Sequence, residues 1–285
     1  DGPSMTDIDG NSYIDLTMGF GPHVLGHRPK VVADALAKQI DRGWHFGIHN
    51  PLQEPLARLI QEAGRNTERT IFCNSGTEAT MYAMRAARAF TGKARVALFD
   101  GSYHGTHDYA LTKAELSSDR SRPASKTMGL GVPELVRDGT MLMLPYRDGT
   151  AFDLIREHAD DLALVMIEPV QSSNPRVDTG DFLRELARVC AESEVLFLLD
   201  EVITGFRLAY GGGQEYFDVA ADLVTYGKAI GGGMPIGALS GRADIMELFG
   251  GDRGRDDGVF SGGTFSGNPL TMAAGTAAIG YLRDN

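Results

Sequence analysis

The sequence predicts an α/β protein with a mostly parallel central sheet flanked by helices. Short, continuous apolar runs rich in β-branched residues alternate along the chain with longer segments of helical periodicity. This alternation is typical of parallel strands that are buried on both faces and connected by helices. The runs also lead directly into polar or glycine-rich residues. In open α/β sheets ligands bind beyond the carboxyl ends of the strands, so the pattern predicts a binding site there.

The chain is expected to begin with a less regular part. Residues 7–15 predict a hairpin with Asp9-Gly10-Asn11 as its turn, and residues 31–40 predict a helix that begins near Pro29. The alternating part then predicts strands at 70–73, 95–99, 162–167, 195–199 and 223–226, and helices at 76–90 and 181–193. Most of residues 100–131 have the composition of loops.

Charge and composition argue against several classes of function. The 285 residues include 27 basic and 38 acidic side chains, and a net charge of −11 would repel a nucleic-acid backbone. No apolar run approaches the roughly 18–20 residues of a membrane-spanning helix, so no membrane partner is expected. The two cysteines, Cys73 and Cys190, make no disulfide framework and predict a reducing, cytoplasmic location.

The polar segments that follow the predicted strands are expected to converge on one site. They are Asn74-Ser75-Gly76-Thr77, Asp100 to Gly105, Glu168-Pro169, Asp200-Glu201 and Gly227-Lys228. Lys228 lies between a buried strand and a glycine run, where desolvation would lower its pKa and free its amine to attack a carbonyl. The alternative is an exposed lysine at the start of a helix.

Asp200 follows an apolar run, so its carboxylate would be buried at the end of a central strand. A buried carboxylate is costly unless it meets a cation or several donors. The pyridinium nitrogen of pyridoxal phosphate would be such a partner, because that cofactor needs an acid there to act as an electron sink. A helix N-cap and a metal ligand are the alternatives, although no cluster of His and carboxylates with ligand spacing accompanies Asp200.

The segment Ser75-Gly76-Thr77-Glu78 opens an alanine-rich helix. Ser75 and Glu78 fit a capping box, and the free N–H groups at the same helix end fit a phosphate. Tyr103 follows the next strand and could place its ring on a flat cofactor or pack in the core. Gly19-Phe20-Gly21 does not continue as a dinucleotide-binding fingerprint.

Six motifs occur in order along nearly the whole chain. They are Asn74 to Ala79 (NSGTEA), Tyr103-His104-Gly105, Glu168-Pro169-Val170, Asp200-Glu201-Val202, Thr225-Tyr226-Gly227-Lys228 and Gly263 to Pro269 (GTFSGNP). Together they resemble the class III pyridoxal-phosphate aminotransferases, in the branch that contains glutamate-1-semialdehyde 2,1-aminomutase and the aminotransferase domains of polyketide and nonribosomal peptide synthases. This resemblance implies a fold type I enzyme that forms a homodimer with sites at the subunit interface.

The resemblance also implies roles for residues around the cofactor ring. Lys228 would carry pyridoxal 5'-phosphate as a Schiff base and move the proton, and Asp200 would pair with the pyridine nitrogen. Val202 and Tyr103 would pack against the two faces of the ring, and His104 would support the loop that carries Tyr103.

Other residues would bind the phosphate or lie near the substrate. Ser75, Gly76 and Thr77 would hold the phosphate, Thr264 would reach the phosphate of the partner subunit, and Glu168 would lie on the substrate side. The resemblance further implies a small domain that includes residues 1–45 and a large cofactor-binding domain over residues 46–285. The large domain would end in a helix that begins near Asn268 and leads to a C-terminal domain absent from this sequence.

Departures from the family pattern bear on the reaction. Ile203 stands where many class III enzymes have glutamine, and Gln171-Ser172-Ser173 replaces the segment found in aminomutases. Several motifs look more like the synthase domains that aminate a β-keto acyl chain on an acyl carrier protein. We therefore expect transfer of an amino group from an amino-acid donor to a keto or aldehyde acceptor. An intramolecular 2,1-aminomutase and a non-catalytic cofactor-binding homologue remain as alternatives.

Overall fold

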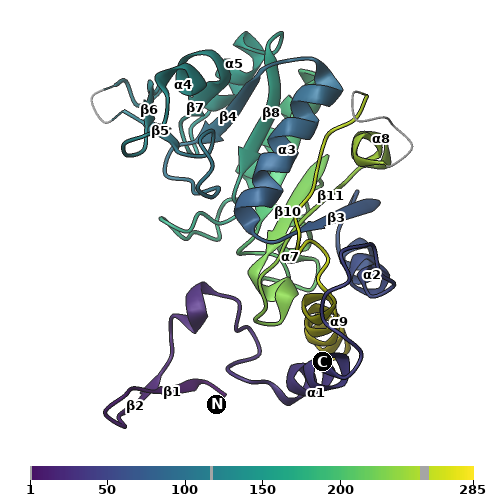
Figure 1. The fold of residues 1–285 in the computed structure, drawn as a ribbon. Helices are drawn as coiled ribbons and strands as arrows, with labels where there is room; N and C mark the ends of the chain where they lie inside the picture. The colour runs from purple at the N-terminus through teal and green to yellow at the C-terminus, as the bar shows by residue number, and fades with distance from the viewer. Residues whose placement is uncertain (1, 116–117, 251–256) are drawn as a thin grey trace.

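A seven-stranded sheet forms the centre of the protein (Figure 1). The computed structural model describes residues 2–115, 118–250 and 257–285. In sheet order the strands are β3 (Arg69–Cys73), β11 (Gly237–Gly241), β10 (Leu223–Gly227), β9 (Leu196–Glu201), β8 (Leu162–Ile167), β4 (Arg95–Phe99) and β7 (Met141–Leu144). Strands β10, β9, β8, β4 and β7 pair in parallel, whereas β11 runs antiparallel to both of its neighbours. The predicted α/β class with a mostly parallel sheet is confirmed.

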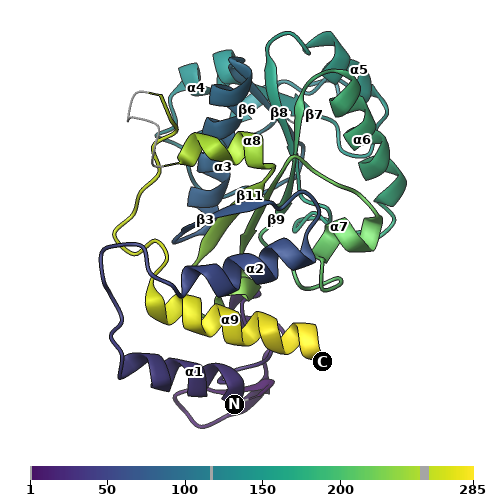
Figure 2. The same cartoon turned by 90° about the vertical axis from the view of Figure 1, so that its right-hand side faces the viewer.

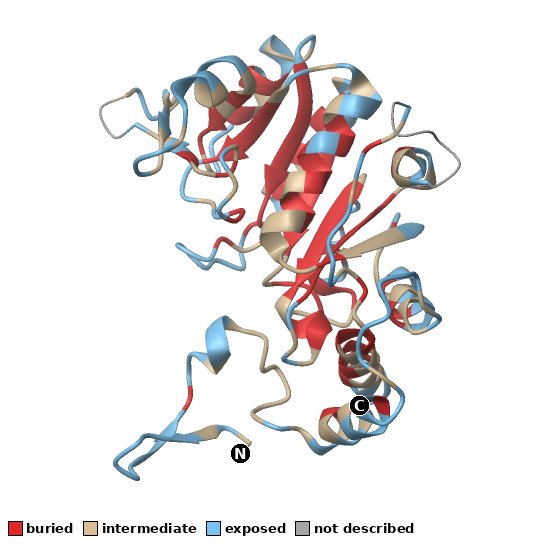
Figure 3. Cartoon of the chain, in the orientation of Figure 1, coloured by how far each residue is buried: buried red, intermediate tan, exposed pale blue. Residues whose placement is uncertain are grey.

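Helices cover both faces of this sheet (Figure 2). One apolar core joins the sheet to α2 (Gln53–Ala63), α5 (Thr150–Glu157), α6 (Gly180–Glu192) and α9 (Pro269–Asp284). The other core joins it to α3 (Gly76–Thr91) and α8 (Ala243–Met246). Burial is therefore concentrated in the strands and in the helix faces that touch them (Figure 3).

Local sequence explains where the best-predicted elements begin and end. All six residues of β8 are buried, as expected for a strand covered on both faces. Helix α3 begins where the Ser75 hydroxyl accepts a hydrogen bond from the Glu78 N–H at 3.2 Å, and it ends at Gly92, whose φ of 71° is left-handed. The alanines of α3 lie against the sheet, so that the helix can approach it closely.

The N-terminal segment lies apart from the main sheet (Figure 1). Strands β1 (Ser4–Thr6) and β2 (Ser12–Ile14) form the expected hairpin, although it starts earlier than predicted because the turn extends back to Asp7. The Asp7 carboxylate accepts hydrogen bonds from the N–H groups of Asp9 and Asn11, which fixes this wide turn. Helix α1 (Lys30–Ile40) then packs against α9. A domain division at residue 45 stays a prediction.

Two further differences from the predicted elements concern the sheet and the loops. Strand β9 continues through Asp200 and Glu201, which were expected to follow it, because Asp200 is in register with Thr225 on β10. Part of the expected loop region contains a short hairpin, β5 (Thr112–Ala114) and β6 (Ser125–Thr127), followed by α4 (Glu134–Thr140). None of the helices in the described residues has the length and apolar composition needed to cross a bilayer.

Candidate functional site

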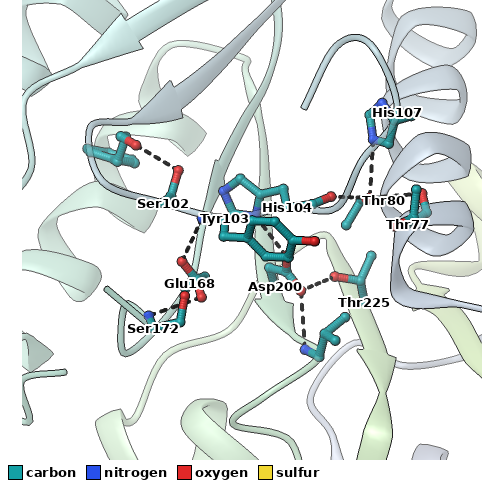
Figure 4. Close-up of polar contacts among 12 residues, drawn as sticks. Thr77, Thr80, Ser102, Tyr103, His104, His107, Glu168, Ser172, Asp200 and Thr225 are labelled. Carbon is teal, nitrogen blue, oxygen red and sulfur yellow. Dashed lines mark hydrogen bonds and ion pairs between the residues drawn. The ribbon is translucent and has the colours of Figure 1, made fainter. Parts of the chain in front are cut away.

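Four neighbouring parallel strands bring the predicted site residues to one edge of the sheet (Figure 4). His104 follows β4, Glu168 follows β8, Asp200 lies near the end of β9, and Lys228 directly follows β10. The convergence expected from the polar strand ends is therefore present, and it extends over adjacent strands of one sheet.

Asp200 is held in a fixed orientation by three groups. Its Oδ1 accepts hydrogen bonds from the Thr225 hydroxyl at 2.9 Å and the Val202 N–H at 3.1 Å, and its Oδ2 lies 2.7 Å from His104 Nδ1. Asp200 is only 4% exposed. A carboxylate offers about four acceptor positions, so one remains for a further donor.

The surroundings of His104 decide which ring nitrogen carries its proton. His104 Nε2 is buried and has no hydrogen-bond partner among the described residues. An N–H group in that position would be buried without an acceptor, which is costly, so the proton belongs on Nδ1, where it can be donated to Asp200. His104 therefore donates to Asp200 Oδ2 and helps to hold the buried carboxylate in place.

Lys228 provides an amine near this anion. Its backbone has a left-handed φ of 47°, at the point where β10 gives way to the short 3₁₀ turn η2 (Lys228–Gly231). Desolvation lowers the pKa of Lys228, Asp200 and Glu168 act to raise it, and Arg207 lowers it further. No hydrogen bond or ion pair of the Lys228 ammonium occurs within the described part of the chain. The amine is thus partly desolvated and free to react.

Glu168 joins two of the loops that border the site. Its carboxylate accepts hydrogen bonds from the Tyr103 N–H at 3.0 Å and the Ser172 N–H at 3.2 Å. Burial raises the pKa of this carboxyl. The Tyr103 side chain is 51% exposed, and Figure 4 shows its ring projecting from the same loop as His104. Glu168 therefore fixes the backbone that carries the exposed ring.

The start of α3 offers donors to an anion. No hydrogen bond within the described residues uses the N–H groups of Gly76 and Thr77, whereas the Thr77 hydroxyl accepts a bond from Thr106. The reciprocal contact of the predicted capping box differs slightly, because the Glu78 carboxylate accepts from the Asn74 N–H rather than from that of Ser75. The helix end keeps two free donors together with the positive end of its dipole.

Val202 lies between this helix end and the lysine. A Cβ atom on Gly76 would approach Val202 Cγ1 to 2.9 Å, and one on Gly227 would approach the same atom to 3.2 Å. Glycine at position 76 is therefore needed for the close approach of helix and strand. Val202 therefore packs between Gly76 at the start of α3 and Gly227, the residue before Lys228.

Two supporting residues were not singled out from the sequence. The Thr80 hydroxyl donates to the His104 carbonyl at 2.7 Å, and His107 Nε2 lies 3.2 Å from that hydroxyl (Figure 4). Burial lowers the pKa of His107 to about 4. No local signal marks these residues, because Thr80 lies inside a helix and meets the loop only after folding.

Thr264 is not brought into this cluster. It is exposed and lines a groove with Phe46, Ile48 and Gly267, away from Asp200 and Lys228. Within residues 2–115, 118–250 and 257–285, no three His, Cys, Asp or Glu side chains are grouped as metal ligands would be.

Comparisons with known proteins match the whole chain to one family. The sequence model of the family described as Aminotransferase class-III matches residues 1–285. The chain belongs to the class III aminotransferase family. One curated relative, the glutamate-1-semialdehyde 2,1-aminomutase of Archaeoglobus fulgidus, is 42% identical to this chain over 285 residues. That of Ignicoccus hospitalis is 42% identical over 284 residues.

Solved structures agree with this assignment. An omega-transaminase from Sphaerobacter thermophilus superposes with a TM-score of 0.91 at 35% identity and covers 99% of this chain. A structure described as a transaminase with PLP bound gives a TM-score of 0.89 at 31% identity, again over 99% of this chain. The class III chain spans 66% of the Archaeoglobus protein and 65% of each of the two solved chains.

Proposed function

We propose that this class III chain is a pyridoxal-phosphate-dependent aminotransferase that moves an amino group from an amino-acid donor to a keto or aldehyde acceptor. The observation that carries this proposal is the buried Asp200 carboxylate at the end of β9, with the Lys228 amine at the end of the adjacent β10. Family membership and the likeness to a transaminase with PLP bound support it.

The residues present fit this cofactor. Asp200 has an acceptor position left for the protonated pyridine nitrogen, and the free N–H groups of Gly76 and Thr77 would bind the phosphate. Val202 would lie against one face of the ring, and Tyr103 would cover the other. When bound, pyridoxal phosphate supplies an electron sink that stabilises negative charge developing on the substrate carbon.

Lys228 would handle the proton in this reaction. A lysine with a lowered pKa is neutral for a larger fraction of the time, so its Nζ can accept a proton from the substrate α-carbon and return it. The negative charges of Asp200 and Glu168 limit the decrease in pKa and keep the protonated form accessible as well. His104 and Thr225 act indirectly, because they hold the Asp200 carboxylate in place.

Absorbance tests the proposal most simply. Purified protein with the cofactor should show an absorption band at the boundary between near-ultraviolet and visible light. Lys228→Ala should change or abolish that band. Lys113→Ala is the matched control, since Lys113 is an exposed residue of β5. A band that persists unchanged in Lys228→Ala would contradict the assignment of Lys228.

A second candidate is intramolecular 2,1-amino transfer. The names of the curated relatives at about 42% identity favour it. An aminomutase needs no separate amino donor, so turnover of a single amino aldehyde without added donor would support it. Strict dependence on a donor would support the transaminase instead.

We also propose the finer features that the motifs imply. A homodimer would cover the groove lined by Thr264, Phe46 and Ile48, of which the last two are exposed apolar side chains. The synthase-like motifs make a β-keto acyl chain on an acyl carrier protein a candidate acceptor, and the cysteine usage favours the cytoplasm. A non-catalytic homologue is disfavoured, because both Lys228 and Asp200 are present and placed together.

A further inference from the structure

Arg207 borders the same space as the reactive lysine. Its Nη2 donates a hydrogen bond to the Gly21 carbonyl, and its Nε donates to the Ile203 carbonyl at 2.9 Å. An atom at the Cβ position of Gly21 would lie 3.2 Å from Arg207 Nη2 and 3.5 Å from Lys228 Cδ. The guanidinium and the lysine side chain therefore meet across Gly21, whose missing side chain leaves that space open.

Arg207 binds neutral groups in the part of the chain that the structure describes. Among the described residues, Arg207 forms no ion pair with a carboxylate. A guanidinium carries five N–H donors, and the hydrogen bonds to other described residues use two of them, both on neutral carbonyl groups. The side chain is exposed on one side, yet the protein atoms on the other side desolvate it and lower its pKa.

Arg207 places a second cation beside Lys228, in a space that also holds the carboxylates of Asp200 and Glu168. Arg207 lowers the pKa of Lys228, whereas Asp200 and Glu168 raise it. The net charge of the chain is −11, so its surface as a whole would repel an anion. The Arg207 guanidinium, which binds neutral carbonyl groups among the described residues, is therefore the charge that would draw an anionic group to this point.

The backbone turns sharply where both cations are attached. Phe206 and Lys228 have left-handed φ values of 58° and 47°, which are unfavourable for residues with a side chain. Phe206 is buried against Tyr210 and Tyr226, and this packing holds the conformation. The backbone next to Arg207 is consequently held in one conformation, and this fixes the point from which the Arg207 side chain extends.

We infer that Arg207 binds an anionic group of the substrate, and that a carboxylate is the ligand class it fits. The planar guanidinium matches the two oxygens of a carboxylate, and its remaining N–H groups are free to form paired hydrogen bonds. A carboxylate held there would lie beside the Lys228 side chain, so the rest of the substrate would reach the amine. The inference rests on the proposed function, because the carboxylate belongs to the substrate that would react at Lys228.

Binding of a non-reacting carboxylate tests this directly. The holoenzyme would be titrated with propionate and, separately, with its neutral analogue propionamide, and binding would be followed by calorimetry and by the cofactor absorbance. Arg207→Gln should weaken propionate binding about 10- to 100-fold, the effect of losing a charge-assisted pair. Propionamide binding should be unchanged, and Arg207→Lys should be intermediate. Arg58→Gln, an exposed helix arginine paired with Glu54, is the matched control.

Three results would overturn the inference. They are failure of the wild-type protein to bind propionate, equal binding by Arg207→Gln, and equal loss for propionate and propionamide. The last result would mean that Arg207 only anchors the Gly21 segment. Failure of the proposed function is distinguishable, since it would appear as absence of the Lys228-dependent absorbance, whereas calorimetry would still report whether Arg207 binds the carboxylate.

Discussion

Replacing Asp200 with asparagine probes the anion at the centre of the site. The substitution keeps the size of the side chain, and an amide oxygen can still accept from Thr225 and Val202. It removes the negative charge, and the amide nitrogen would face His104 Nδ1, which now lies 2.7 Å from Asp200 Oδ2. Two donors would then oppose each other unless the His104 proton moved to Nε2, which has no hydrogen-bond partner among the described residues.

The magnitude follows from the buried charge pair that Asp200 would form with the protonated pyridine nitrogen of the cofactor. Removing one partner of such a pair costs about 3–5 kcal/mol, and each 1.36 kcal/mol corresponds to a factor of ten. We therefore expect Asp200→Asn to lower kcat/KM for transamination by roughly 10²- to 10⁴-fold. The measurement is the half-reaction with a single amino donor, followed by cofactor absorbance.

A matched variant separates charge from packing. Thr225→Val removes one hydrogen bond to the same carboxylate but keeps the charge, and should cost only about 1 kcal/mol, or roughly fivefold in rate. An Asp200→Asn enzyme within a few-fold of wild-type would refute the reasoning. So would a Thr225→Val loss as large as that of Asp200→Asn.

Three further predictions follow from the contacts around the site. Gly76→Ala should weaken binding of the cofactor measured by absorbance titration, because the new Cβ would approach Val202 Cγ1 to 2.9 Å; unchanged affinity would contradict the close packing. Thr80→Val should lower the free energy of unfolding by about 1–3 kcal/mol, since the His104 carbonyl loses its donor, and a denaturant titration would measure this. The pKa of His107 is lowered from 6.5 to about 4, so the unfolded chain binds more protons between these values. The free energy of unfolding should therefore fall by up to about 3 kcal/mol as pH decreases from about 6.5 to 4, and it should fall less in His107→Gln. The same dependence on pH in both proteins would contradict the role given to His107.

The sequence predicted best those elements whose residues are apolar throughout. Strands β4 and β8 begin and end where expected, because every interior position is buried. Strand β11 (GALSG) was not predicted, since its small residues carry no strand signal and its place depends on pairing between β3 and β10. Helix α2 was missed as well. It is held in place by burying Leu56, Leu59 and Ile60 in the core, a tertiary effect.

The site residues likewise fall into two groups, those that the sequence predicts and those that only the folded structure shows. Asp200, Glu168 and Lys228 could be found because each lies at or next to a strand end, so one rule about parallel sheets places them together. Thr80 and Arg207 could not be found by that rule. Arg207 meets the Gly21 carbonyl across 186 positions of sequence, and only the folded chain brings them into contact.

The most direct test of the account is to locate the lysine that binds the cofactor. The holoprotein would be treated with borohydride, digested, and its peptides analysed by mass spectrometry. We expect a single phosphopyridoxyl group on Lys228, the lysine at the end of the strand next to Asp200. A group attached to any other lysine, or no attachment in protein that retains the cofactor, would contradict the central claim.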